Sequence, residues 1–270
     1  WVPLTECYND TYVRDSTYGI TFAPDMYEKD DVRSVVQMWL ALSSKTAGPR
    51  PGETLLRAPE AMLLTGQVDS GCLDNTAFLM KLVAFYATQW DDPGFLCAHE
   101  PELAALFRWN LAARDTKPPS HTRNPRSTYR SAHGSTLGTS GTHSSSTHDT
   151  TPYTAGYGLW YLPGGTCGYG FIDSVGLPSG HNLFMSLLFV ESARAVADAL
   201  QKAQCHLTVP LTNYTAEATR TANAVSALLF NDDVGMFHAT DVEGEGYGKT
   251  DVFGSVFAAA LGVGSAAQRD

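Results

Sequence analysis

Hydrophobic residues recur at helical spacing along most of this chain. Between 28 and 42, for example, Val32, Val36 and Trp39 fall four and three positions apart, as on one face of an amphipathic helix. Strand signals are few and short, so the pattern predicts an all-α fold of successive helical hairpins separated by long loops. The expected helices cover about 28–42, from 74 onward, 100–113, 182–204, 214–230 and from about 250.

The segment from Thr116 to Ala155 has a different composition. It contains Ser, Thr, His, Arg, Pro and Gly with almost no aliphatic residues, so it cannot bury enough apolar surface to offset chain entropy. Metal binding by its histidines is conceivable, but their scatter lacks ligand spacing and favours a solvated loop. We interpret 116–155 as a disordered insert, or a segment foreign to the fold, between two parts of one helical barrel, 1–115 and 156–270.

Charge and length exclude some functions. The 270 residues can bury a full core in one or two domains. The net charge is −10 and no Lys/Arg cluster builds a basic face, which argues against nucleic acid as a partner. No apolar run reaches the roughly 18 residues of a membrane span. The chain starts at Trp1 without an initiating Met, which suggests a removed leader or a fragment.

The cysteines give no local pattern. No C-x-x-C pair occurs, so zinc is improbable and a disulfide framework is unsupported. Two triplets, Asn9-Asp10-Thr11 and Asn213-Tyr214-Thr215, would permit glycosylation in a secretory compartment. Such triplets also arise by chance, so the compartment, secreted or cytoplasmic, and the oligomeric state stay open. The five cysteines are Cys7, Cys72, Cys97, Cys167 and Cys205.

An Arg-Asp pair near the start, within Tyr12–Tyr18, is suited to holding a sugar. The Arg14 guanidinium would donate to neighbouring hydroxyls, the Asp15 carboxylate would accept from them, and the Tyr18 ring would stack on a C–H face. The alternative is a structural ion pair at a helix start. Trp160 and Tyr169 lie in expected loops and suit sugar stacking as well, or they plug the ends of a barrel.

If the sugar held by this pair is hydrolysed at its glycosidic bond, the reaction usually needs two carboxyl groups, an acid with a raised pKa and a carboxylate on the opposite face of the sugar. Asp74 and Asp173 are our first choices for these roles, with Asp251 and Glu245 behind them. Asp74 and Asp251 also fit helix N-caps, Asp173 an Asx-turn and Glu245 a solvated loop. The full set of candidates in Gly- or aromatic-rich junctions is Asp15, Asp69, Asp74, Asp173, Glu243, Glu245 and Asp251.

These motifs resemble the six-hairpin, or (α/α)6-barrel, glycosidases. Tyr12–Ser16 is similar to an element of glucoamylases and glycogen-debranching enzymes in which the Arg-Asp pair holds the terminal sugar. Val68–Asp74 resembles an acidic stretch of trehalases and processing glucosidases that contains the general acid. Leu228–Phe237 and Thr250–Ser255 resemble a turn and the next helix start in the same group. The resemblance implies an inverting hydrolase of O-glycosidic bonds that acts on a carbohydrate, without cofactor or metal.

The pattern provides about half of the helices that six hairpins need, so we expect an incomplete toroid. Two other functions are compatible with it. One is a non-catalytic carbohydrate-binding protein, and the other is a sugar lyase or epimerase that uses a Tyr or His base. The histidines of the expected helical regions are His99, His181, His206 and His238.

Overall fold

The fold is built from paired helices, as the periodicity predicts. The expected helices over 28–42 and 182–204 correspond to α2 (Lys29–Leu42) and α6 (Leu183–Ala203). None of the described helices combines the length and hydropathy that a bilayer span requires. The expected insert, 116–155, lies outside the described part of the chain. The computed structural model describes residues 10–63, 65–69, 72–114, 158–162, 180–241 and 250–269.

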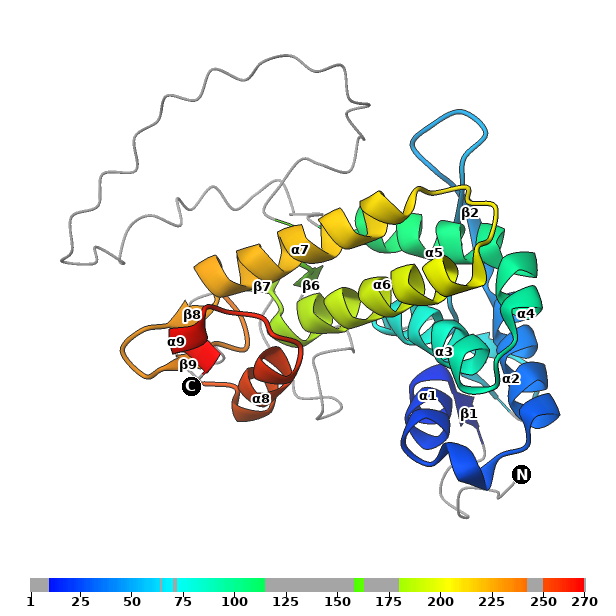
Figure 1. Ribbon diagram of the computed structural model, residues 1–270, viewed down its shortest axis with the longest axis horizontal. Coiled ribbons are helices and arrows are strands. Elements are labelled where there is room, and N and C mark those ends of the chain that lie inside the picture. The colour runs from blue at the N-terminus through cyan, green and yellow to red at the C-terminus, as the bar shows by residue number, and fades with distance from the viewer. Residues whose placement is uncertain are drawn as a thin grey trace.

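Four helices form an inner layer and pack in chain order, α1 on α3, α3 on α6 and α6 on α8. Most positions of α3, and nearly every position of the first half of α6, are buried, as expected for helices that are apolar on most faces. Figure 1 shows α6 between its neighbours in the middle of the arc. The bounds are Val13–Phe22 for α1, Asn75–Gln89 for α3, Leu183–Ala203 for α6 and Val252–Ala260 for α8.

A row of aromatic rings fixes the orientation of the inner helices. Tyr18 lies 5.1 Å from Phe78, Phe78 lies 6.3 Å from Phe184, and Phe184 lies 6.2 Å from Phe257, measured between ring centroids. Each ring belongs to the first two turns of a different inner helix. The inner helices therefore begin at the same end of the molecule. We call this end, where α1, α3, α6 and α8 start, the mouth.

An outer layer covers the inner one. α2 packs against α3, α5 against α3 and α6, and α7 along the length of α6, and the long antiparallel α6–α7 hairpin is plain in Figure 1. Successive pairs of inner and outer helices thus form an arc of a toroid. The bounds are Lys29–Leu42 for α2, Pro93–Ala98 for the short α4, Glu100–Ala113 for α5 and Leu211–Leu228 for α7; η1 spans Pro24–Met26 and α9 Ala266–Arg269.

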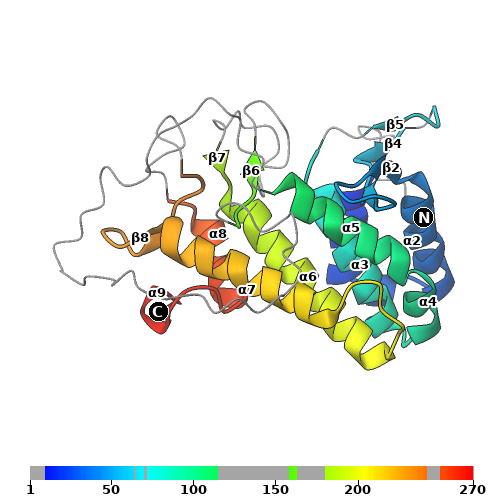
Figure 2. The ribbon, with the colours of Figure 1, turned by 90° about the horizontal axis from the view of Figure 1, so that it is seen from above.

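The described strands are short and precede the inner helices. β1, β4 and β5 form one sheet, and β2–β3, β6–β7 and β8–β9 form antiparallel pairs. β4, β5, β6 and β7 lie along one edge of the molecule in Figure 2. The strands are Thr11–Tyr12 (β1), Ser44–Ala47 (β2), Thr54–Arg57 (β3), Ala61–Met62 (β4), Val68–Asp69 (β5), Tyr161–Leu162 (β6), Gly180–His181 (β7), Phe230–Asn231 (β8) and Met236–Phe237 (β9).

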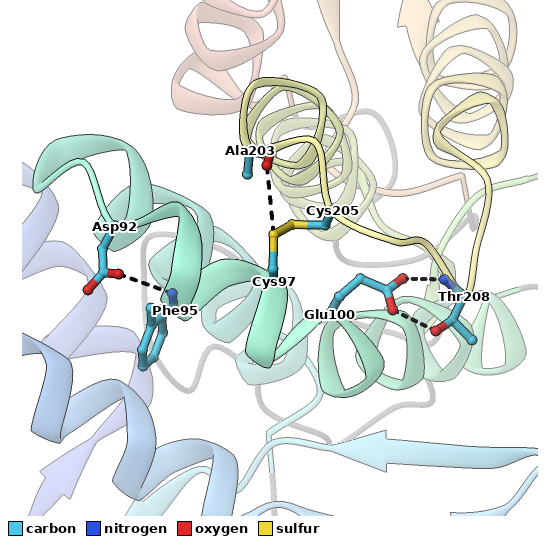
Figure 3. Close-up of a disulfide and its surroundings, with 7 residues drawn as sticks. All are labelled: Asp92, Phe95, Cys97, Glu100, Ala203, Cys205 and Thr208. Carbon is cyan, nitrogen blue, oxygen red and sulfur yellow. Dashed lines mark hydrogen bonds between the residues drawn. A yellow bond between two sulfur atoms is a disulfide. The ribbon is translucent and has the colours of Figure 1, made fainter.

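A disulfide joins Cys97 to Cys205, 108 residues further along the chain. It ties α4 to the segment that follows α6 (Figure 3). Cys72 is disulfide-bonded as well. The sequence offered no support for a disulfide framework, yet these three cysteines are bonded. Widely separated cysteines meet here because α4 packs against α6. The spacing of cysteines along the sequence cannot predict such a contact.

Gly254, in the first turn of α8, allows α8 to approach α6 closely. A Cβ at this position would overlap the end of the Leu183 side chain and would lie 2.6 Å from Asp251 Oδ2. We expect Gly254→Ala to lower the free energy of unfolding by about 1–3 kcal/mol, as overpacking does, measured by urea unfolding. Gly94→Ala is the control, because its nearest contact would be 3.9 Å away. Equal stability of the Gly254 variant and the wild type would contradict this close approach.

Candidate active site

Arg14 and Asp74 form an ion pair at the mouth. Arg14 lies in the first turn of α1, and Asp74 immediately precedes α3. The Asp74 side chain is fully buried and that of Arg14 is 14% exposed. The guanidinium carbon also lies 6.0 Å from the centroid of the Phe78 ring. Two residues that the sequence analysis selected separately, one for sugar binding and one for acid catalysis, are thus in contact.

Asp74 does not act as an ordinary N-cap. It precedes α3, but its side chain makes no capping hydrogen bond and its backbone is already helical, with φ −73° and ψ −21°. Asp251 differs, because it has extended backbone and accepts a 2.8 Å hydrogen bond from the backbone N–H of Gly254. The capping alternative therefore accounts for Asp251 but leaves Asp74 without that explanation.

Burial raises the pKa of Asp74 to about 6. The adjacent Arg14 favours the ionised form and opposes this shift, whereas the charge of Glu60 adds to it. Desolvation outweighs the single cation because the carboxyl group has no access to water. A carboxyl group with this pKa carries its proton in mildly acidic solution, which is the property required of a general acid in glycoside hydrolysis.

The same shift makes stability depend on pH. The pKa of Asp74 is about 6 in the folded protein and about 3.9 in an unfolded chain. Its protonated form therefore stabilises the fold fully below about pH 4, and this contribution is lost as the pH rises through 6. Asparagine does not titrate, so Asp74→Asn does not lose stability in this way. The free energy of unfolding of the variant, relative to that of the wild type, should therefore rise by about 2–3 kcal/mol from pH 4 to pH 7.

Urea unfolding of both proteins at the two pH values measures this gain. The ion pair with Arg14 is absent from the variant at either pH, so its cost cancels in the comparison. The prediction fails if the difference in unfolding free energy between the two proteins is the same at both pH values.

Tyr18 lies one turn after Arg14 on α1. Burial raises its pKa to about 12, with the charges of Arg14 and Asp74 acting in opposite directions. Its hydroxyl therefore stays protonated and can donate a hydrogen bond over the whole physiological range. Its ring stacks on Phe22 at 5.5 Å and meets Phe78 edge-on. Asp15, on the next position of α1 from Arg14, is exposed.

Trp160 does not belong to an open loop. Its side chain is fully buried, its ring lies 5.9 Å from that of Trp109, and its backbone N–H donates to Ser186 Oγ at 3.1 Å. The expectation that it stacks on a sugar from a loop is corrected, because this ring packs in the hydrophobic core. Tyr169, Asp173, Glu243 and Glu245 lie outside the described residues and remain predictions.

Two carboxylates, one near Asp74 and one near Tyr18, were missed by the sequence analysis. Glu60 precedes β4, accepts a 2.9 Å hydrogen bond from the backbone N–H of Cys72 and acts on the pKa of Asp74. Glu191, on α6, pairs with Lys81 of α3 at 2.8 Å and acts on the pKa of Tyr18. The signal for Glu191 was available, because it is the first charged residue after eight uncharged positions of a buried helix.

His181 and Asp241 form a second polar cluster beside the start of α6. One Asp241 oxygen accepts from the backbone N–H of His181 at 2.7 Å, and the other lies 2.5 Å from its ring Nδ1. His181 is 5% exposed, and its ring meets that of Tyr161 at 5.4 Å. A carboxylate at Nδ1 fixes the orientation and tautomer of an imidazole. Sequence reasoning named His181 only as one of several possible bases.

Other features of the surface offer less chemistry. A shallow hollow of about 540 Å³ lies on α7, and another of about 630 Å³ lies at the β2–β3 turn. Neither is lined by Arg14 or Asp74. Among the described side chains, no group of three His, Cys, Asp or Glu is placed to hold a metal ion. We therefore take the Arg14–Asp74 pair as the candidate site, because it combines a buried carboxyl of raised pKa with a guanidinium group.

Comparison with known proteins identifies the architecture. Neither protein-family models nor curated proteins match this sequence. A rhamnosidase from Klebsiella oxytoca with rhamnose bound aligns with a TM-score of 0.60 and 10% identity, over 97% of this chain and 40% of that one. A GH78 family rhamnosidase of Bacillus sp. GL1 aligns with a TM-score of 0.58 and 15% identity, over 96% and 22% of the respective chains.

This chain therefore spans less than half of the length of either rhamnosidase. At such low identity the likeness shows the fold alone. It confirms the predicted helical toroid architecture, of which the described helices form an arc, and it gives no support to a glucoamylase-like subfamily in particular.

Proposed function

We propose that this chain contributes the acid side of a glycoside hydrolase site, with Asp74 as the general acid. The observation that carries the proposal is the fully buried Asp74 carboxyl, with a pKa of about 6, paired with Arg14 at the mouth. Arg14 and Tyr18 bind sugar hydroxyls beside it, and the exposed Asp15 carboxylate accepts a hydrogen bond from a further hydroxyl. The site uses no cofactor.

In the proposed reaction the protonated Asp74 transfers its proton to the glycosidic oxygen as the bond between that oxygen and the anomeric carbon breaks. A second carboxylate removes a proton from a water that attacks from the opposite face, which inverts the configuration. Asp173 and Glu245 are the sequence-based candidates for this base. Glu60 and Glu191 are the described alternatives, since each lies close enough to influence Asp74 or Tyr18. Asp251 is the weakest candidate, because its carboxylate already caps α8.

Rhamnosides are the first substrates to test, because one similar structure holds rhamnose, and glucosides come next from the sequence resemblance. Release of the phenol from aryl rhamnosides and aryl glucosides measures turnover, and NMR of the first-formed sugar reports its anomeric configuration. We expect kcat/KM to fall as the pH rises above about 6, because Asp74 then loses its proton. Turnover that is flat across this range would contradict Asp74 as the acid.

Glu191→Gln and Glu60→Gln identify the base. The variant that loses turnover and regains it with added azide contains the substituted base, since azide attacks the anomeric carbon without a proton to lose, and the product is a glycosyl azide. Binding of the free sugar without any turnover, measured by calorimetry, would favour the alternative of a non-catalytic carbohydrate-binding protein.

The His181–Asp241 cluster supports one other function, a sugar lyase or epimerase. An imidazole held by a carboxylate can abstract a proton next to a carbonyl or carboxyl group. Unsaturated products from a uronic-acid polymer, lost in His181→Gln but kept in Asp74→Asn, would identify a lyase and displace the hydrolase proposal.

A further inference from the structure

Asn213-Tyr214-Thr215 is a glycosylation triplet that begins in the first turn of α7. Tyr214 is fully buried, and its ring lies 4.1 Å from that of Phe107. The two residues that define the triplet, Asn213 and Thr215, are both exposed. The helix therefore points the central residue into the core and presents the acceptor asparagine and the threonine to solvent.

The disulfides give an independent indication of compartment. Cys97 and Cys205 are bonded to each other, and Cys72 is also disulfide-bonded, so each cysteine among the described residues is oxidised. Disulfides form and persist in oxidising compartments, such as the lumen of the endoplasmic reticulum. Asparagine glycosylation takes place in that compartment on Asn-X-Ser/Thr triplets. The bonded Cys205 lies only eight positions before Asn213.

We propose that Asn213 carries an N-linked glycan. The side-chain nitrogen of Asn213 forms a bond to the anomeric carbon of an oligosaccharide held on a polyprenyl diphosphate lipid. The sugar–phosphate bond breaks, the lipid diphosphate leaves with its electron pair, and the amide nitrogen loses one proton. No oxidant or reductant takes part.

Asn213 lies far from the mouth. α6 starts at the mouth and runs for 21 residues before the chain turns into α7, a distance of about 30 Å along the helix axis. Asn213 therefore lies at the opposite end of the α6–α7 hairpin, which Figure 1 shows in full. A glycan there would enlarge the outer surface of the molecule far from the Arg14–Asp74 pair, so the proposal is independent of the hydrolase function.

The test is secretion of the full chain from a eukaryotic host, in an Asn9→Gln background that leaves one triplet. We expect peptide mapping to find a glycan on Asn213, and peptide-N-glycosidase to remove it and convert Asn213 into aspartate. Asn213→Gln and Thr215→Ala should abolish the mass shift. Thr215→Ser should retain it because it preserves the triplet, and Thr212→Ala, in the same turn, is the matched control.

Secreted, disulfide-bonded protein with an unmodified Asn213 would overturn the proposal. The two variants that remove the triplet act on different residues, so a folding defect in one does not decide the outcome. The proposal would also be overturned if Thr215→Ser, like Thr215→Ala, carried no glycan mass beyond that of its own polypeptide.

Discussion

Asp74→Asn is expected to reduce glycoside turnover by about 10²–10⁴-fold, the usual contribution of a general acid. Asparagine has nearly the same shape and can still accept a hydrogen bond from Arg14, but it has no proton to give to the leaving oxygen. Binding of the free sugar should change little, because Arg14 and Tyr18 remain. The loss should therefore be in kcat, measured with an aryl glycoside whose leaving group needs protonation.

A substrate with a good leaving group sharpens the test. A dinitrophenyl glycoside needs little protonation, so the variant should recover most of its turnover on this substrate. Asp92→Asn is the matched control, since asparagine caps helices about as well as aspartate and Asp92 caps α4 by accepting a hydrogen bond from the backbone N–H of Phe95. A variant at position 74 that hydrolyses all substrates at the wild-type rate would remove Asp74 from the mechanism.

Arg14→Gln separates the two roles of the ion pair. Arg14 lowers the pKa of Asp74 against the larger effect of burial, so its loss should raise that pKa above 6. The alkaline limb of the pH–rate profile should then move to higher pH, while KM rises because a sugar-binding guanidinium is gone. If KM rises without any movement of the profile, Arg14 binds substrate but does not tune the acid.

The sequence predicts the helices better than it predicts their contacts. The helix expected over 182–204 is observed as Leu183–Ala203, with Asn182 as the cap accepting from the backbone N–H of Met185. α1 was not predicted as a helix of its own, because Gly19 and its threonines have low helix propensity. The burial of Val13, Thr17 and Ile20 indicates that packing against α3 stabilises it instead.

The candidate site was only partly accessible from sequence. Arg14 was recognisable from the Arg-Asp pair flanked by tyrosines, and Asp74 from its place at an expected helix start. Their contact was not, since it depends on α1 and α3 lying parallel. Trp160 does precede β6 in an irregular segment, as expected, but its burial depends on Trp109 and Ser186, which are distant in the chain.

Removal of the Cys97–Cys205 disulfide is expected to have the largest effect on stability. The bond closes a loop of 108 residues, and the chain-entropy model gives about 4–5 kcal/mol for a loop of this size. We expect the Cys97→Ala/Cys205→Ala double variant to lose that much free energy of unfolding. The urea m-value should rise, because the unfolded chain is less constrained and exposes more surface.

The folded geometry around the bond should survive its removal, because other contacts hold the same segment. The buried Glu100 carboxylate accepts from the backbone N–H of Thr208 at 2.8 Å and from its hydroxyl at 2.5 Å (Figure 3). Glu100→Gln removes the charge from these bonds but leaves the disulfide in place, so it should lower stability with an unchanged m-value. If the double cysteine variant, like Glu100→Gln, loses stability with an unchanged m-value, the disulfide acts through native contacts. Its constraint on the unfolded chain is then negligible.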